Sequence, residues 1–107
     1  MSGLLIKREP LAQDTLGYMI VKVGLHSCKV SNNEYDNVNH YHWRPKRKKK
    51  KIYAVRRFTR NGKTYEISMH RQIMGSPPGI EPHHKNHDTL DNRRENLENV
   101  PHNRHPH

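Results

Sequence analysis

The dipeptide Asn61-Gly62, which separates two runs of strand-forming residues, constrains the fold of this chain more than any other feature of its sequence. Asn-Gly is the preferred two-residue β-hairpin turn, because both of its positions need a positive φ. The runs at 52–59 and 64–69 are therefore predicted to form an antiparallel hairpin. Three cross-strand pairs follow from this turn: Phe58 with Tyr65, Arg57 with Glu66, and Ala54 with Met69.

The predicted hairpin has two unlike faces, because successive side chains of a strand point to opposite sides of the sheet. One face is apolar and comprises Ala54, Phe58, Tyr65, Ile67 and Met69. The other face comprises Arg57, Thr59 and Thr64. This polar face is either an ordinary exposed surface or one that enters a nucleic-acid groove, as β-ribbon readers do. Residues 41–45 are predicted to add a third strand to the hairpin.

Two more strands and a short helix are expected before this sheet. The strands are predicted at 17–23 and at 25–30, where strand-forming residues gather. Ser31 and Glu34 have the spacing of a capping box, in which each side chain satisfies a backbone N–H of the first helical turn. A short helix to about Asn39 should follow.

The fold class follows from these elements and from a scarcity of apolar residues. One helical turn is expected at 70–74, and the prolines within 75–79 end it. Only 31% of the residues are hydrophobic, so a large core is not expected. The sequence predicts an α+β fold: a small antiparallel β-sheet with short helices over 1–74, followed by a C-terminal module over 75–107.

Cysteine and apolar content exclude several classes of protein. Cys28 is the one cysteine, so a disulfide within the chain and a zinc site built on paired cysteines are excluded. No apolar run approaches the length of a membrane span, and no secretory signal is visible, so we expect an intracellular protein. Trp43 is expected in the core, and His70 is expected to pack rather than to catalyse.

Positive charge gathers in the middle of the chain. The formal net charge is +10, and no acidic residue lies between Asp36 and Glu66. A polyanionic partner is the favoured explanation, and a merely soluble basic protein is the alternative. The basic run 46–51 is either a solvated loop or a set of phosphate contacts.

The C-terminal third contains histidine, asparagine and arginine residues in the order and spacing of a motif. This segment contains His83-His84, then Asp91-Asn92-Arg93, then Asn96-Leu97, and finally His105, nine residues after Asn96. The pattern resembles the HNH, or ββα-metal, endonuclease motif, and its His-His opening resembles the colicin-type nucleases. The preceding segments 53–57 and 70–75 resemble phage and homing endonucleases. The two parts in this order are more specific than either alone.

The resemblance implies a role for each of these residues. His84 would be the general base that takes a proton from water, and His83 with His105 would hold one divalent metal ion. Asn96 would brace the loop, with Asn92 as a second candidate. Histidine suits the base because its free pKa is near neutral, and a cation suits the reaction because it neutralises the phosphodiester. Neighbouring side chains of a strand point to opposite faces, which fits one ligand and one base.

The sequence also departs from the pattern of its relatives. His83 stands where many relatives have Asp, and two imidazole ligands favour Mn, Co, Ni or Zn over Mg. His87 stands where many relatives have Gly. A further ligand could be His102, His107 or water.

Double-stranded DNA is the partner that the resemblance implies, in a bacterial or phage-infected cytoplasm. The side chains expected to contact it are Arg56, Arg57, Arg60, Arg93, Arg94, Lys48 and Lys49. For Arg93 and Arg94 the alternative is a loop ion pair with Asp91 or Glu95. The products would be nicks or double-strand breaks with 5′-phosphate and 3′-hydroxyl ends, and a homodimer would allow both strands to be cut. Two other functions stay open: a catalytically inactive DNA-binding relative, and a histidine-rich metal-binding protein.

Overall fold

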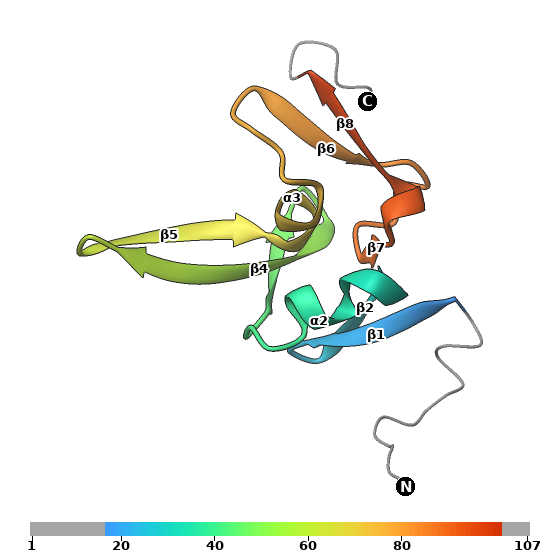
Figure 1. Ribbon diagram of the computed structural model, residues 1–107, viewed down its shortest axis with the longest axis horizontal. Helices are drawn as coiled ribbons and strands as arrows, with labels where there is room; N and C mark the ends of the chain where they lie inside the picture. The colour runs from blue at the N-terminus through green and yellow to red at the C-terminus, as the bar shows by residue number, and fades with distance from the viewer. Residues whose placement is uncertain (1–16, 102–107) are drawn as a thin grey trace, which may run out of the picture.

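Three small sheets and four short helices make up residues 17–101, the part of the chain that the computed structural model describes (Figure 1). The first sheet has the order β1-β2-β7, with strands at Tyr18–Val23, His26–Ser31 and Asp91–Asn92. The second has the order β3-β4-β5, at Arg44–Lys48, Lys51–Arg60 and Lys63–Ser68. The third pairs β6 (Ile80–His84) with β8 (Leu97–Pro101).

The helices are short and connect the sheets. They are η2 (Asn32–Glu34), α2 (Tyr35–Val38), α3 (Met69–Met74) and η3 (Arg94–Asn96). Helix α3 ends at Gly75, which adopts a left-handed conformation with φ of 59°. This mixed, sheet-rich arrangement fits the predicted α+β class. Within 17–101, no helix has both the length and the apolar character needed to cross a membrane.

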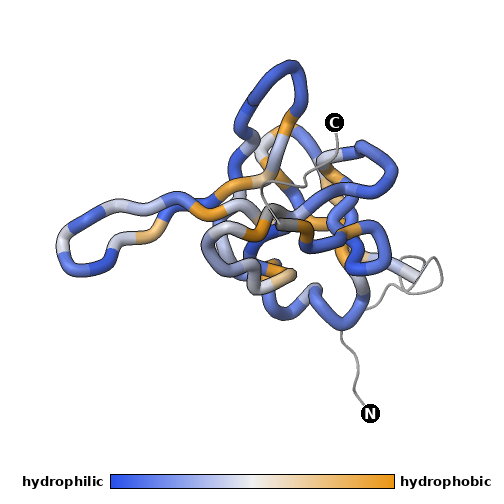
Figure 2. Tube along the Cα trace, turned by 90° about the horizontal axis from the view of Figure 1, so that it is seen from above, coloured by the Kyte–Doolittle hydropathy of each residue, from blue (hydrophilic) through white to orange (hydrophobic). Residues whose placement is uncertain are grey.

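The hairpin β4–β5 extends away from the body of the molecule as a hydrophilic arm (Figures 1 and 2). Asn61 and Gly62 have φ values of 52° and 78°, as the predicted turn requires. The predicted pairs Phe58–Tyr65 and Arg57–Glu66 are confirmed. The predicted pairing of Ala54 with Met69 is wrong, because the ladder ends at Ser68 and Met69 begins α3.

The third strand of this sheet lies at Arg44–Lys48, later than the predicted 41–45. Two features shift it. Lys49 and Lys50 adopt φ values of 51° and 71° and form a second tight turn, in a run of lysines that carries no turn signal. Trp43 is buried and donates a hydrogen bond from Nε1 to the Val38 carbonyl at 2.7 Å, so it anchors the chain before the strand begins.

The predicted capping box at Ser31 and Glu34 does not form. Ser31 does occupy the N-cap position of η2, but its side chain makes no capping hydrogen bond. Its hydroxyl instead accepts a hydrogen bond from the backbone N–H of Arg94 at 2.8 Å, and the Glu34 carboxylate pairs with the Arg94 guanidinium at 3.1 Å. A tertiary contact therefore replaces the local one.

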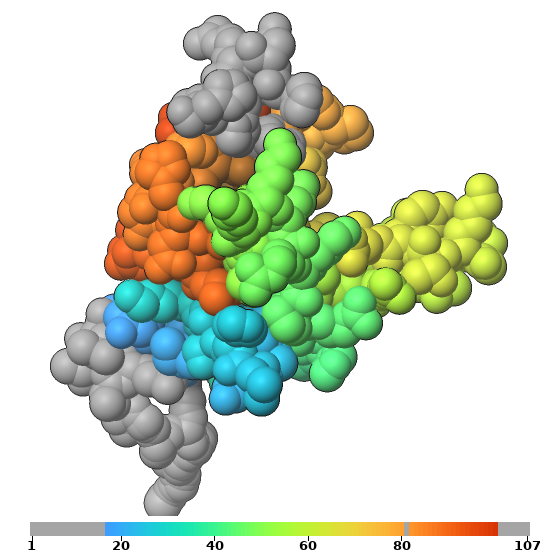
Figure 3. Space-filling model, turned by 180° about the vertical axis from the view of Figure 1, so that it is seen from behind, coloured from blue at the N-terminus to red at the C-terminus, as the bar shows by residue number. Residues whose placement is uncertain are grey.

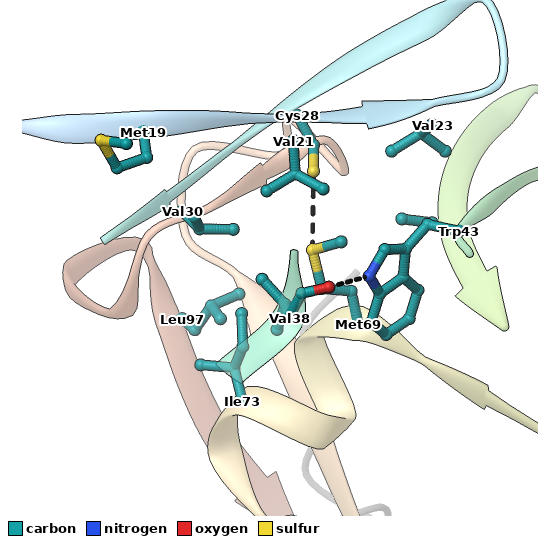
Figure 4. Close-up of a cluster of buried hydrophobic side chains, with 11 residues drawn as sticks. Met19, Val21, Val23, Cys28, Val30, Val38, Trp43, Met69, Ile73 and Leu97 are labelled. Carbon is teal, nitrogen blue, oxygen red and sulfur yellow. Dashed lines mark hydrogen bonds between the residues drawn. The ribbon is translucent and has the colours of Figure 1, made fainter. Parts of the chain in front are cut away.

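The hydrophobic core lies where β1, β2, α2, α3 and β8 meet (Figure 4). Its fully buried members include Val23, Val30, Val38 and Met69. Leu97 of β8 packs into the same cluster, and β7 extends the first sheet by parallel pairing with β2. The described parts of the two predicted segments, 17–74 and 75–101, therefore share one core, which fixes the C-terminal strands against the rest of this part of the chain.

Candidate active site

Strands β6 and β8 and the loop between them carry the residues of the resemblance. His83 pairs with Glu98 and His84 with Leu97, so both histidines lie at the end of β6. His84 is 5% exposed and faces the body of the molecule, whereas His83 is only partly buried. The residues after Pro101 lie outside the described part, and these include His102, His105 and His107.

Asn92 holds the ring of His84. The Oδ1 atom of Asn92 lies 2.7 Å from Nε2 of His84 and accepts a hydrogen bond from it. In the neutral ring, Nδ1 then keeps the free lone pair. Asn92 is completely buried, and its Nδ2 has no hydrogen-bond partner within the described residues. The buried Asn92 side chain therefore fixes the orientation of the His84 ring.

Burial lowers the pKa of His84 below its usual value. The hydrogen bond to Asn92 and the charges of Asp88 and Asp91 raise this pKa, and the neighbouring His83 lowers it, but burial is the largest effect. The ring is therefore neutral at neutral pH, which is the form a general base needs.

Two aromatic side chains from the middle of the chain complete the surroundings of His84. The ring of His70, in α3, lies 4.7 Å from the His84 ring, and the ring of Tyr53, in β4, lies 6.2 Å from it. Tyr53 and His70 also contact each other, with ring centroids 5.7 Å apart. Burial lowers the pKa of His70 to about 3, and the charges of His84, Arg71 and Lys48 lower it further, so this ring too is neutral.

Sequence reasoning did not place Tyr53 and His70 beside His84. The available signal was the order of the segments 53–57 and 70–75 before the histidine pair, which carried the family resemblance. That order does not give the distance of Tyr53 or His70 from His84. The contacts depend on how β4 and α3 pack against β6, which only the structure gives.

Asn96 ties the two ends of the loop between β6 and β8 together. Its Oδ1 accepts a hydrogen bond from the Asn86 backbone N–H at 3.0 Å, and its Nδ2 donates to the Asp91 carbonyl at 2.8 Å and to Asn86 Oδ1 at 2.9 Å. The Asn96 carbonyl also accepts from the Lys85 N–H at 2.8 Å. These contacts fix the loop directly after His84.

Asp91 and Arg93 form a paired arrangement in the same loop. The guanidinium donates to both carboxylate oxygens of Asp91 at 2.7 Å, and it also pairs with Glu95 at 3.1 Å. Burial alone would raise the pKa of Asp91, but the hydrogen bonds and charge of Arg93 lower it overall. The loop ion pair that the sequence allowed as an alternative for Arg93 is therefore present.

The other arginines and lysines expected at DNA divide into two groups. Arg56 stacks 3.8 Å from the Tyr41 ring and donates to Gln72 Oε1 at 2.7 Å. Arg94 donates to the Ile73 carbonyl at 2.8 Å. These two side chains support the fold. The exposed group is Arg57, Arg60, Lys48 and Lys49.

Two imidazoles lie together on the other side of β6. The rings of His83 and His87 have centroids 5.6 Å apart and planes at 80°. Imidazole nitrogens suit borderline divalent metals such as Zn, Co and Ni, so the donor type at His83 fits a metal. Within 17–101 no three His, Cys, Asp or Glu side chains gather into a metal site, and His105 lies outside this range.

Comparison with known proteins bears on the C-terminal part of the chain. Residues 70–107 match the family model described as HNH endonuclease. No curated protein and no solved structure matched the chain. The matched segment begins at His70 and contains the pair His83-His84, Asn92 and Asn96, whose contacts are described above. The match over residues 70–107 therefore supports an assignment of this C-terminal segment to the HNH endonucleases.

Proposed function

We propose that the chain is a metal-dependent endonuclease that hydrolyses DNA phosphodiester bonds, with His84 as the general base. The observation that carries this proposal is the state of His84, which is neutral and oriented through Nε2 by Asn92. Its Nδ1 lone pair is then available to take a proton from water. Because His84 is only 5% exposed, the water that loses its proton must lie directly beside the ring.

His83 and His105 are the proposed ligands of the metal, with Mn, Co, Ni and Zn preferred to Mg because the donors are imidazoles. A divalent cation there would supply positive charge to the attacked phosphate and to the leaving oxygen. Asn96 and Asn92 are positioning residues: Asn96 holds the loop that follows His84, and Asn92 holds the ring itself.

DNA would lie along the face of β3-β4-β5 that contains Tyr53 and Arg57. Strand alternation and the pairing of β3 with β4 place Lys46, Lys48 and Arg44 on this same face. The Tyr53 ring lies 6.2 Å from the His84 ring, and the Lys48 ammonium lies 6.0 Å from the Tyr53 ring. One end of this basic face is therefore next to the proposed base.

The same basic face continues along the hairpin arm. A shallow groove of about 400 Å³ runs between β3 and β5, with Arg44, Lys46, Arg57, Thr64 and Glu66 among its lining residues. Phosphate contacts from such a face give affinity without sequence selectivity. Arg60 and Arg56 lie on the opposite face of β4, so we propose Lys48 and Arg57 as the main contacts, with Lys49 at the turn.

Cleavage of supercoiled plasmid in Mg, Mn, Ni or Zn, each with and without EDTA, tests this function. The expected result is nicked circles in at least one metal and none in EDTA; linear product would need a second copy of the chain or a second nick. DNA binding that ignores EDTA, with no cleavage in any metal, would favour the catalytically inactive relative. Binding of several Ni or Zn ions without affinity for DNA at low salt would favour a histidine-rich metal-binding protein.

A further inference from the structure

His87 adopts a backbone conformation that side chains rarely take. Its φ is 66°, in the left-handed region, where a Cβ atom crowds the backbone. Two hydrogen bonds hold it there. The His87 N–H donates to the His84 carbonyl at 2.9 Å, and the Lys51 ammonium donates to the His87 carbonyl at 2.7 Å. In Figure 3 the region of the β3–β4 turn (green) lies against the loop after β6 (orange).

This conformation brings the His87 ring to His83. The ring centroids are 5.6 Å apart and the planes are at 80°. With a metal–nitrogen distance of about 2.0–2.1 Å and a ring centre about 1.1 Å beyond it, two imidazoles on one tetrahedral ion have centres about 5.2 Å apart. The observed separation is slightly larger, so small side-chain rotations would let both rings reach one ion.

The geometry points to His83 and His87 as a two-imidazole chelate for a borderline divalent metal, with His87 as a ligand additional to His83. His87 is exposed and His83 partly so, and an ion can therefore reach the pair from solvent. The imidazoles select Ni, Co or Zn over Mg. The inference rests on the proposed function only in sharing His83, because metal binding is measurable without DNA or cleavage.

Glycine at position 87 separates the role of the ring from that of the backbone. Glycine adopts the left-handed region without steric cost, so His87→Gly keeps the turn and removes the imidazole. The metal-free variant should therefore melt at a higher temperature than the parent. Its melting temperature should rise less when Zn is added, because one ligand is missing. His87→Asn, which also tolerates this conformation, is the second variant.

Zinc titration of the full chain, followed by the histidine side-chain NMR signals, tests the inference. The signals of His83 and His87, assigned from His83→Ala and His87→Gly, should move together and saturate at one equivalent. His87→Gly should weaken this binding by about tenfold or more, and the matched control His26→Ala, an exposed histidine on β2, should not. Unchanged zinc affinity in His87→Gly would overturn the inference. If His83→Ala then still abolishes binding, the proposed function stands without His87.

Discussion

Acid should destabilise this protein through His70, and the size of the effect can be worked out from its surroundings. Burial lowers the pKa of His70 to about 3 in the folded state, whereas the unfolded chain has a histidine pKa near 6.5. Between about pH 6.5 and pH 3, His70 binds a proton in the unfolded state but not in the folded state. The contribution of the neutral His70 to the free energy of unfolding is therefore fully present above about pH 6.5, and it is lost progressively as the pH falls from about 6.5 to about 3.

These two pKa values give a magnitude for the loss. Proton linkage predicts that His70 lowers the free energy of unfolding by about 1.4 kcal/mol at pH 5.5 and by about 2.7 kcal/mol at pH 4.5, against roughly 0.2 kcal/mol at pH 7. The fall of about 2.5 kcal/mol between pH 7 and pH 4.5 corresponds to about 10–20 °C in melting temperature for a domain of this size.

The perturbation is His70→Gln, which removes the titrating ring. Urea unfolding, followed by the fluorescence of the buried Trp43, gives the free energy of unfolding at pH 7, 5.5 and 4.5. The variant can be less stable at pH 7, because it loses the ring contacts with Tyr53 and His84, but its stability should fall less steeply with pH. His26→Gln, at an exposed site, is the matched control and should follow the parent. Parallel pH dependence in the parent and in His70→Gln would refute the reasoning.

Three further predictions concern the loop, the core and the basic face. Asn96→Ala should lower the free energy of unfolding by about 2–3 kcal/mol in urea, because it leaves the buried Asp91 carbonyl without its donor and the Asn86 N–H without its acceptor; a loss under about 0.5 kcal/mol would contradict the bracing role. Trp43→Phe should cost about 1–2 kcal/mol in the same assay through the lost bond to Val38, and an unchanged midpoint would contradict this. Arg57→Gln should reduce the salt dependence of DNA binding by about one unit of slope without changing stability, and an unchanged slope would remove it from the DNA contacts.

Local chemistry made part of the fold predictable from the sequence. Asn61 and Gly62 form the expected turn because the positive φ it needs is intrinsic to these residues. The register of Phe58 against Tyr65 then follows from the turn alone. The helix α3 ends at the start of the segment 75–79, as predicted, but through the left-handed conformation of Gly75 rather than through the prolines.

Contacts between distant segments account for the predictions that were wrong. The Ser31 hydroxyl is used by the backbone of Arg94, which no local pattern reveals. Lys49 and Lys50 form a turn with positive φ values that lysine rarely adopts, so the sequence gives no sign of a turn there. The predicted strand therefore ends at residue 45, whereas β3 continues to Lys48.

For the candidate site, the sequence proposed residues but gave no arrangement for them. The spacing of the motif selected His84, Asn92 and Asn96, and the contacts among them are consistent with a braced loop and an oriented ring. The neighbours of His84 could not be read from the sequence, because Tyr53 and His70 reach it only through the packing of β4 and α3.

The single-turnover cleavage rate of His84→Ala tests the central claim most directly. It should be measured in the metal that supports cleavage, at DNA concentrations that saturate both proteins. Loss of the base should lower the rate by about 10²–10⁴-fold with the DNA dissociation constant unchanged. The matched control His26→Ala should cleave at the parental rate. Cleavage by His84→Ala within about threefold of the parent would contradict the assignment of His84 as the base that activates water.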